Sequence, residues 1–354
     1  MKNLEKFQSL LGEKADGLLL TSRYSRYYGA SFDIAEGVAV VSGKGCRYFT
    51  DSRYIESAEK GIQDFQVEMV GNGRSYYQLI NQAIADFGIT KLGYEENYLT
   101  MAEFLDYEKN LKAELVAMNR EIHGFRAVKE DWELALMRKA QDITDAAFAQ
   151  VVQRIRAGMT EKELCAELIY CLFRNGADGL SFDPIVVSGP NTSLPHGVPG
   201  DRKIQEGDFI TMDFGVLYRG YCSDMTRTVA LGYATEEMKT VYNTVLQAQL
   251  AGIAATRAGV TGRSIDEAAR KVIADAGYGD YFGHGYGHSL GLEIHENPGC
   301  NHAGTVEMQE NMVCSAEPGI YLPGKFGVRI EDVVIFKEGG CEDITNSPKE
   351  LMIV

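Results

Sequence analysis

The chain has 354 residues, of which 45% are hydrophobic and 24% charged, as is usual for a globular protein with one large domain or two ordinary ones. Its formal net charge of −15 argues against a nucleic-acid-binding surface, which would need a basic stripe. No apolar run is long enough to span a bilayer, so we expect no membrane segment.

The cysteines and the N-terminal residues bear on the compartment. Seven cysteines are scattered without a CxxC spacing, which predicts reduced thiols and neither a disulfide framework nor a zinc site. Residues 1–17 lack the apolar core of a signal peptide. Together these features predict a cytoplasmic protein.

Short apolar strands alternate with helices in the first third of the chain. We expect strands at residues 17–22, 38–43, 46–51, 66–70 and 114–119. Helices are expected at residues 75–88 and 100–112, the second capped by Thr100 with Glu103. The polar stretch 119–132 then marks a boundary between a smaller α/β domain, residues 1–120, and a second domain, residues 121–354.

The second domain contains an internal duplication. After an amphipathic helix predicted at 133–158 and ended by Gly158, the segment RAGMT at 156–160 recurs as RAGVT at 257–261. Each precedes a helix, for which the expected caps are Thr160 with Glu163 and Ser264 with Glu267. Residues 205–216 also align without a gap with residues 309–320. We therefore expect two equivalent halves related by an approximate two-fold axis.

Each half carries a pair of carboxylates in a predicted β-hairpin. In the first, a turn at residues 218–219 would put Asp213 directly opposite Asp224, whereas a turn at 219–220 would make them diagonal neighbours on one face. In the second, a loop at 322–325 brings Glu317 face to face with Glu331. Like charges so placed destabilise a bare sheet.

Four inward-facing carboxylates with an imidazole such as that of His288 nearby indicate a pair of divalent cations, and hence a hydrolytic metalloenzyme. The mostly oxygen donors favour Mn²⁺, with Co²⁺ or Zn²⁺ as alternatives. Arg329, two residues from Glu331 on the same strand face, is expected to orient one of the carboxylates.

Histidines gather in loops rich in glycine and proline, where functional residues concentrate. The four are His196, His284, His288 and His295. One imidazole is enough to complete an oxygen-rich metal pair, and the others can bind substrate or stabilise developing charge. His123 and His302 fit a structural role better.

Several motifs together resemble those of the pita-bread metallopeptidases, and within these the proline-specific branch, aminopeptidase P and Xaa-Pro dipeptidase (prolidase). In order they are FDPIVVSGPNTSLPHGVPG, MDFGV, YCSDMTRTV, GHGYGHSLGLEIHENP, SAEPGIY and VRIEDVV. The resemblance covers essentially the whole chain. It implies an α+β fold in which a pita-bread catalytic domain with an internal pseudo-two-fold repeat follows a creatinase-like α/β domain.

The resemblance also implies roles for single residues. The metal ligands would be Asp213, Asp224, His288, Glu317 and Glu331, with Asp224 and Glu331 bridging two ions. His196, His284, His295 and Arg329 would serve the substrate site, with His196, His295 and Glu317 taking part in catalysis. Tyr286 stands where the family usually has a smaller residue, and we expect it near the pocket mouth.

The expected function is hydrolysis of the bond between an N-terminal residue and a following proline, by a homodimer acting on peptides. The nearest alternative is a dipeptidase that cleaves Xaa-Pro dipeptides only. Methionine aminopeptidases of the same fold usually lack the N-terminal domain. Creatinase-like amidinohydrolases and non-enzymatic binding relatives lack the metals or their ligands, so retention of all five ligands argues against both.

Overall fold

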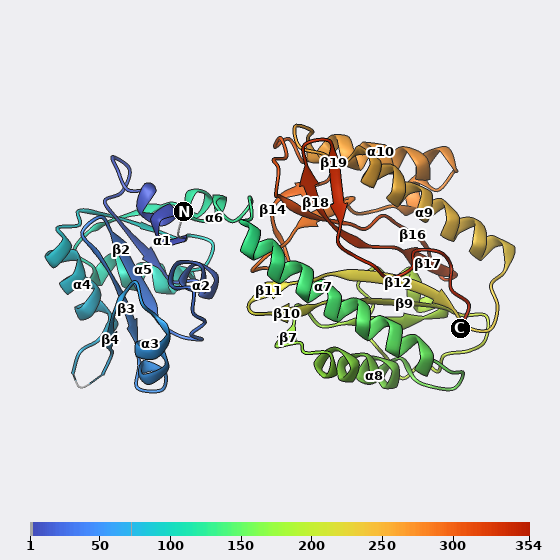
Figure 1. Ribbon diagram of the computed structural model, residues 1–354, viewed down its shortest axis with the longest axis horizontal. Helices are drawn as coiled ribbons and strands as arrows, with labels where there is room; N and C mark the ends of the chain where they lie inside the picture. The colour runs from blue at the N-terminus through green and yellow to red at the C-terminus, as the bar shows by residue number, and fades with distance from the viewer. Residues whose placement is uncertain (1–2, 72) are drawn as a thin grey trace. The chain divides into compact units, whose positions relative to one another are not determined.

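A computed structural model describes residues 3–71 and 73–354. The chain divides into two compact units, of which the first ends at Phe125 and the second comprises Arg126–Val354 (Figure 1). Among the described residues, no helix is both long and apolar enough to cross a membrane.

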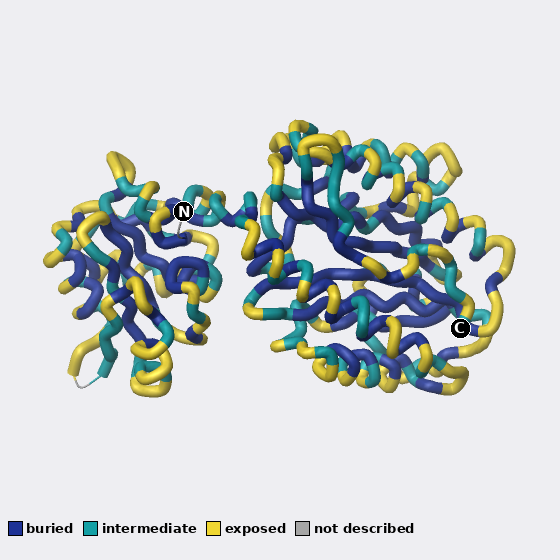
Figure 2. Tube along the Cα trace, in the orientation of Figure 1, coloured by how far each residue is buried: buried dark blue, intermediate teal, exposed yellow. Residues whose placement is uncertain are grey.

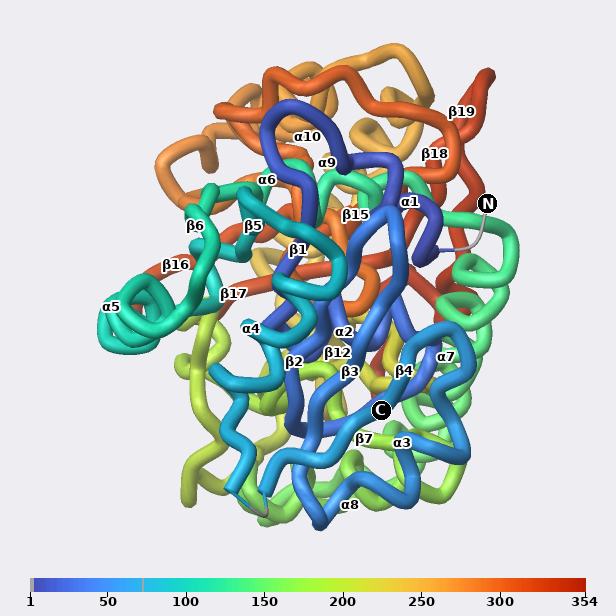
Figure 3. The backbone as a smooth tube through the Cα atoms, turned by 90° about the vertical axis from the view of Figure 1, so that its left-hand side faces the viewer, coloured from blue at the N-terminus to red at the C-terminus, as the bar shows by residue number. Residues whose placement is uncertain are grey.

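A mixed β-sheet with the strand order β4-β3-β2-β1-β5-β6 forms the centre of the N-terminal unit (Figure 3). Its strands are β1 (Gly17–Leu20), β2 (Val38–Ser42), β3 (Gly45–Thr50), β4 (Gln66–Met69), β5 (Lys91–Tyr94) and β6 (Glu114–Ala117). The predicted strands are confirmed, but β5 was not predicted, because Leu92 and Tyr94 are its only large apolar side chains. β1 pairs antiparallel with β2 and parallel with β5.

The helices of this unit are α1 (Asn3–Ser9), α2 (Arg23–Ala30), α3 (Ile55–Gly61), α4 (Tyr76–Phe87), α5 (Met101–Asn110) and α6 (Asn119–Gly124). The two predicted helices, α4 and α5, are confirmed, and both begin with a capping box. Leu79 and Ile80 of α4 pack against Val40 and Phe49 of the sheet, which forms the apolar core of the unit.

Two helix pairs flank the strands of the C-terminal unit (Figure 1). They are α7 (Asp131–Val151) with α8 (Glu161–Arg174), and α9 (Glu236–Ala255) with α10 (Gly262–Asp275). The prediction that the first helix runs to Gly158 is wrong, because a 3₁₀ turn (Val152–Arg154) follows Val151 and Ile155 is already extended. The N–H of Gly158 donates to Ile204 O and is therefore not part of a helix.

The strands between these helices are mostly buried (Figure 2). In the first half they are β7 (Gly179–Leu180), β8 (Ile185–Ser188), β9 (Phe209–Phe214), β10 (Val216–Tyr218), β11 (Tyr221–Cys222) and β12 (Met225–Ala230). In the second half they are β13 (Gly287–Ser289), β14 (Glu296–Cys300), β15 (Val313–Ala316), β16 (Gly319–Leu322), β17 (Phe326–Arg329), β18 (Asp332–Lys337) and β19 (Gly340–Asp343). Short 3₁₀ segments follow β8 (Gly189–Ser193) and precede β13 (Gly279–Tyr281). The strand orders are β12-β9-β8, β11-β10-β7, β14-β13-β15-β18-β19 and β16-β17.

The internal repeat appears in matching backbone hydrogen bonds. Gly158 N–H donates to Ile204 O, and Gly259 N–H donates to Met308 O, each with an N–O distance of 2.8 Å. These contacts join RAGMT and RAGVT to the segments that lead into β9 and β15. The two halves are thus built on the same plan.

Equivalent helices in the two halves begin with equivalent caps, but the predicted capping residue is right for α8 and wrong for α10. Thr160 and Glu163 form the predicted capping box of α8. The prediction that Ser264 caps the equivalent helix is wrong, because α10 begins earlier and the Thr261 side chain accepts from the N–H of Ser264. Thr261 is the residue that matches Thr160 in the repeat.

Candidate metal centre

The first carboxylate hairpin turns at Arg219 and Gly220, since Tyr218 pairs with Tyr221 across β10 and β11. Both turn residues have positive φ, 46° and 80°, as a two-residue type I′ turn requires. The first of the two predicted turns, at residues 218–219, is therefore wrong, and the second is confirmed.

This turn fixes the register of the first carboxylate pair. Asp213 lies opposite Thr226 across β9 and β12. Asp224, two residues before Thr226, is therefore the diagonal neighbour of Asp213 on the same face. Both side chains are buried.

The second carboxylate pair lies face to face. The register of β15 with β18 and of β16 with β17 places Glu317 opposite Glu331, as predicted. The pairings on either side are Ala316 with Asp332 and Gly319 with Arg329.

One cavity of about 610 Å³ brings the predicted site residues together. The predicted metal ligands, catalytic residues and substrate-binding residues all line it: His196, Asp213, Asp224, His284, His288, His295, Glu317, Arg329 and Glu331. Apolar residues complete the wall, among them Phe182, Ile185 and Ile294.

The imidazole of His288 faces two carboxylates. Its Nε2 lies 3.3 Å from Glu317 Oε1 and 3.5 Å from Asp224 Oδ2. Its Nδ1 lies 3.2 Å from Ser289 O, which assigns the proton of the neutral ring to Nδ1. Burial lowers the pKa of His288, so the neutral form is favoured. A lone pair on Nε2 then points at two anions, an arrangement that a cation would stabilise.

Three buried carboxylate oxygens of this cluster have no hydrogen-bond partner within residues 3–71 and 73–354: Asp213 Oδ1, Asp224 Oδ1 and Glu331 Oε1. A buried carboxylate oxygen destabilises the folded chain unless it accepts a hydrogen bond or coordinates a metal. Ligand atoms of Asp224, His288 and Glu331 also lie within 4.8 Å of one another. The residues present therefore fit a divalent metal.

The raised pKa values of the clustered carboxyl groups also indicate a site for a cation. Burial, together with the charges of Asp213 and Glu317, raises the pKa of Asp224 well above its usual value. Burial and the charge of Asp224 do the same to Glu331, and burial also raises the pKa of Glu317. Without a compensating cation the cluster cannot hold all its carboxylates ionised.

Arg329 contacts one of the predicted ligands and compensates part of this charge. Its Nη2 lies 2.5 Å from Asp213 Oδ2 and its Nε donates to Thr226 Oγ1 at 3.0 Å. Its Nη1 donates to Pro195 O at 3.2 Å, next to His196. Arg329 therefore holds a predicted ligand and the loop that carries a predicted substrate residue.

Two hydroxyl groups in the site were missed by sequence reasoning. Thr226 Oγ1 donates to Glu331 Oε2 at 2.7 Å. Tyr321 OH accepts from Arg329 Nη1 at 2.9 Å and contacts His284 Nε2 at 2.8 Å. The hairpin register could have indicated Thr226, as the residue opposite Asp213, but no spacing in the sequence singles out Tyr321.

The remaining cavity histidines differ in how firmly they are held. His284 is fixed by Tyr321 and by its own contact with Gly285 O. The His295 ring lies edge-on to His288, with centroids 4.4 Å apart. Burial lowers the pKa of both His284 and His295, which favours neutral rings able to donate one N–H.

A buried ion cluster anchors the segment that carries His295. Glu296 Oε1 accepts from Arg126 Nη2 at 2.6 Å, and Glu296 Oε2 accepts from Lys129 Nζ at 2.9 Å. Arg126 also pairs with Glu293. These pairs fix the chain on both sides of His295, a feature that the sequence did not reveal.

The expectation that Tyr286 lies near the pocket mouth is wrong. Its ring is buried, its hydroxyl donates to Gln249 O at 2.9 Å, and it is not among the residues that line the cavity. The ring occupies the space beside Gly252 of α9, where an added Cβ would lie 2.2 Å from it. The absent side chain of Gly252 thus accommodates the large residue at position 286.

Comparisons with known proteins extend over the whole chain. Residues 135–338 match metallopeptidase family M24, and residues 4–128 match the creatinase/prolidase N-terminal domain. The uncharacterized peptidase YqhT of Bacillus subtilis (strain 168) is 41% identical over 353 residues, which are 99% of each chain.

Two solved structures are closely similar. The Xaa-Pro dipeptidase from Bacillus anthracis has a TM-score of 0.96 and 40% identity, covering 100% of this chain and 99% of that one. The X-Pro aminopeptidase from Thermotoga maritima MSB8 has a TM-score of 0.94 and 36% identity, covering 100% of both. The expected fold, a pita-bread domain after a creatinase-like domain, is confirmed, and the chain is a metallo-exopeptidase that belongs to metallopeptidase family M24.

Proposed function

We propose that this metallopeptidase is an Xaa-Pro aminopeptidase, which removes the N-terminal residue from peptides with proline in second place. One observation carries the proposal. Four carboxylates and His288 line the same cavity as His196, His284 and His295. The similarity to the Thermotoga maritima enzyme supports it. The similarity to the Bacillus anthracis dipeptidase favours a second candidate, a prolidase acting on Xaa-Pro dipeptides only.

Five side chains would hold two divalent cations: Asp213, Asp224, His288, Glu317 and Glu331. The three unpartnered carboxylate oxygens among them support this assignment. We propose Asp224 and Glu331 as the bridging ligands and Mn²⁺ as the metal, because oxygen donors predominate, with Co²⁺ or Zn²⁺ as alternatives. When bound by these residues, such ions would lower the pKa of a water to near neutral and polarise the scissile carbonyl.

Glu317 is the proposed proton carrier. Its Oε1 accepts from Ser315 Oγ at 3.1 Å, and Ser315 Oγ in turn accepts from the backbone N–H of His288 at 3.0 Å. A carboxylate within hydrogen-bond reach of the attacking water can act as a general base. It can therefore take the proton of the attacking water and pass it to the leaving amine.

The cavity histidines serve the substrate in this proposal. A neutral His295 can donate its N–H to the oxygen of the scissile carbonyl as negative charge develops there. His196, held through the Pro195–Arg329 hydrogen bond, takes part in the same step, and His284 borders the proline ring. Proline carries no N–H, so the site need offer no acceptor at that position. Arg329 contributes to substrate binding by fixing the loop of His196.

The proposal extends to compartment and assembly. The cysteines are all free in the structure, which supports a reducing compartment such as the cytoplasm. The homodimer implied by the family resemblance is tested by light scattering of the purified enzyme, where a single-chain mass would contradict it.

Peptide length separates the two candidate activities. We expect Mn²⁺-loaded enzyme to cleave Xaa-Pro-Yaa tripeptides and longer peptides at least as well as Xaa-Pro dipeptides. Hydrolysis of the dipeptides alone, with Xaa-Pro-Yaa untouched, would replace the aminopeptidase by the prolidase. The same assay after treatment with a chelator should show no turnover of either substrate.

A further inference from the structure

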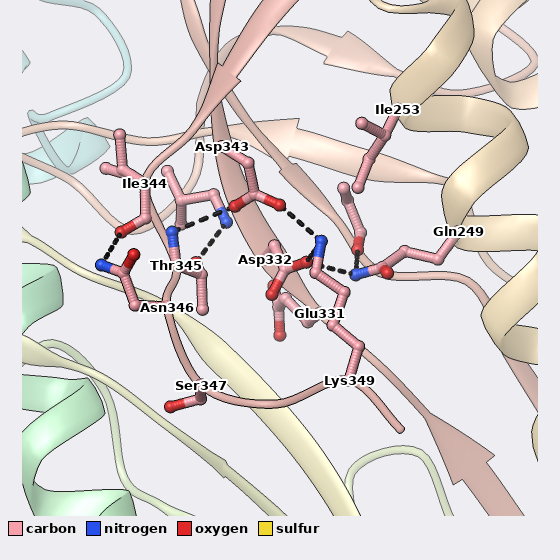
Figure 4. Close-up of polar contacts among 12 residues, drawn as sticks. Gln249, Ile253, Glu331, Asp332, Asp343, Ile344, Thr345, Asn346, Ser347 and Lys349 are labelled. Atoms are coloured by element: carbon pink, nitrogen blue, oxygen red, sulfur yellow. Dashed lines mark hydrogen bonds and ion pairs between the residues drawn. The ribbon is translucent and has the colours of Figure 1, made fainter. Parts of the chain in front are cut away.

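The segment of residues 343–349, which begins at the last residue of β19, closes a buried network beside the proposed bridging ligand Glu331. We call this segment the C-terminal clamp. Figure 4 shows it next to Glu331 and Asp332, with the side chain of Lys349 reaching back toward β18 and β19. No clamp residue lines the cavity, so none is placed to contact a substrate.

Arg227 of β12 links the clamp to the metal ligand. Its side chain is buried, with a relative exposure of 1%. Each of the five N–H groups of its guanidinium has an acceptor. These acceptors are Pro348 O at 2.9 Å, Thr226 O at 3.0 Å, Glu331 O at 2.6 Å, Ser347 O at 2.8 Å and Asp332 Oδ1 at 2.6 Å. One side chain thus ties the backbone of the clamp to the backbone of Glu331.

Asp332 makes a second link. Its Oδ2 accepts from Gln249 Nε2 at 2.8 Å and lies 2.5 Å from Lys349 Nζ (Figure 4). Lys349 Nζ also lies 2.5 Å from Asp343 Oδ2, so one ammonium group bridges two carboxylates. Because Asp332 follows Glu331 directly in the chain, displacement of its carboxylate would also move the bridging ligand.

The clamp itself is held from both halves of the repeat. In the first half, Asp145 of α7 accepts from the N–H groups of Asn346 and Ser347, each at 2.9 Å. In the second half, Tyr242 of α9 donates its hydroxyl to Lys349 O at 2.8 Å. The clamp therefore spans the two halves whose carboxylates meet in the metal centre.

We propose that the C-terminal clamp is a positioning element for the metal ligand Glu331, acting through Arg227 and Asp332. The proposal rests on the proposed role of Glu331 as a ligand. A rigid clamp holds the Glu331 backbone in place before any metal arrives, so binding costs less reorganisation. Partners that orient a ligand in this way typically alter metal affinity about 10- to 100-fold when removed.

Calorimetric titration of Mn²⁺ into the metal-free full-length chain at 25 °C tests this. Lys349→Met removes the ammonium bridge, and Lys349→Arg keeps a cation that can still pair with both carboxylates. We expect about 10-fold weaker Mn²⁺ binding in Lys349→Met and recovery of most of that loss in Lys349→Arg. The matched control is Lys271→Met, which breaks an exposed ion pair with Asp275 on α10 and should bind Mn²⁺ like the wild type.

The outcomes separate the possible failures. A clamp with a purely structural role would lower the melting temperature of the metal-free Lys349→Met variant and leave its Mn²⁺ affinity unchanged, which would overturn the proposal. If Lys349→Met does not fold, the nearly isosteric Asp343→Asn tests the same ion pair, and wild-type affinity in that variant would again overturn it. Absence of Mn²⁺ binding by the wild type would instead contradict the proposed function.

Discussion

Thr226 pairs with Asp213 across β9 and β12, and its hydroxyl donates to Glu331 Oε2 at 2.7 Å. The same hydroxyl accepts from Arg329 Nε at 3.0 Å. A neutral residue between two anionic ligands thus joins the two halves of the repeat. It also fixes which oxygen of Glu331 is left for a metal, since Oε1 has no partner among the described residues.

Removal of this hydroxyl should weaken the site. In Thr226→Val, Glu331 Oε2 and Arg329 Nε would lose their buried partner while the side-chain volume stays nearly the same. We expect Mn²⁺ affinity and kcat to fall about 10- to 100-fold. Thr226→Ser keeps the hydroxyl and should retain most of both, and equal losses in the two variants would show that packing, not the hydrogen bond, matters.

The proposed bridging role of Asp224 predicts that its replacement abolishes metal binding without destabilising the metal-free protein. Asp224→Asn should abolish stoichiometric metal binding and activity. It should not lower the melting temperature of the metal-free protein, because it removes a charge that burial and Asp213 disfavour. Elemental analysis and calorimetric melting measure the two effects. Near-normal turnover in this variant would contradict a two-metal site.

His295 is expected to act after the metals and the substrate are bound. His295→Ala should lower kcat by about two to three orders of magnitude, which corresponds to a lost donor worth roughly 3–4 kcal/mol. Its metal content should remain that of the wild type. Loss of metal from this variant would make His295 a ligand and contradict the role assigned to it.

The ion cluster beside His295 predicts an acid-dependent stability. Burial alone would raise the pKa of Glu296, but Lys129 and Arg126 hold it at about 2, below its usual 4.5. Ionised Glu296 therefore stabilises the folded chain above pH 4.5, and this contribution is lost as the pH falls toward 2. At pH 7, the free energy of unfolding of Glu296→Gln should be lower than that of the wild type by about 3 kcal/mol.

Denaturant unfolding of both chains between pH 7 and the lowest pH at which they remain folded measures this difference. The difference in free energy of unfolding between the wild type and Glu296→Gln should become smaller as the pH is lowered. A difference independent of pH would mean that the Glu296 ion pairs do not stabilise the folded state.

The carboxylate pairs emerged from the sequence because metals bind carboxylates and because the repeat aligned Asp213 with Glu317, whereas the roles of the single histidines came from the family resemblance. The register of the first hairpin could not be chosen, since turns at 218–219 and 219–220 both satisfied the pattern. The pairing of Tyr218 with Tyr221 and the positive φ angles of Arg219 and Gly220 decide between them.

Other features depend on contacts between distant segments. The position of Tyr286 follows from space left by Gly252, 34 residues earlier in the chain, and no local pattern reveals it. Four of the five acceptors around Arg227 come from residues more than 100 positions later in the chain, so the sequence shows only an arginine in a strand. Helix ends were missed for a similar reason, because Gly158 bonds to a segment far along the chain.

A titration of chelator-treated enzyme with Mn²⁺ tests whether the chain is a two-metal peptidase specific for proline. Hydrolysis of an Xaa-Pro-Yaa peptide would be followed beside that of the matched Xaa-Ala-Yaa peptide. We predict that activity returns with two equivalents of Mn²⁺ per chain and that the proline peptide is cleaved far faster than the alanine peptide. Activity that survives complete metal removal, or equal cleavage of the two peptides, would contradict it.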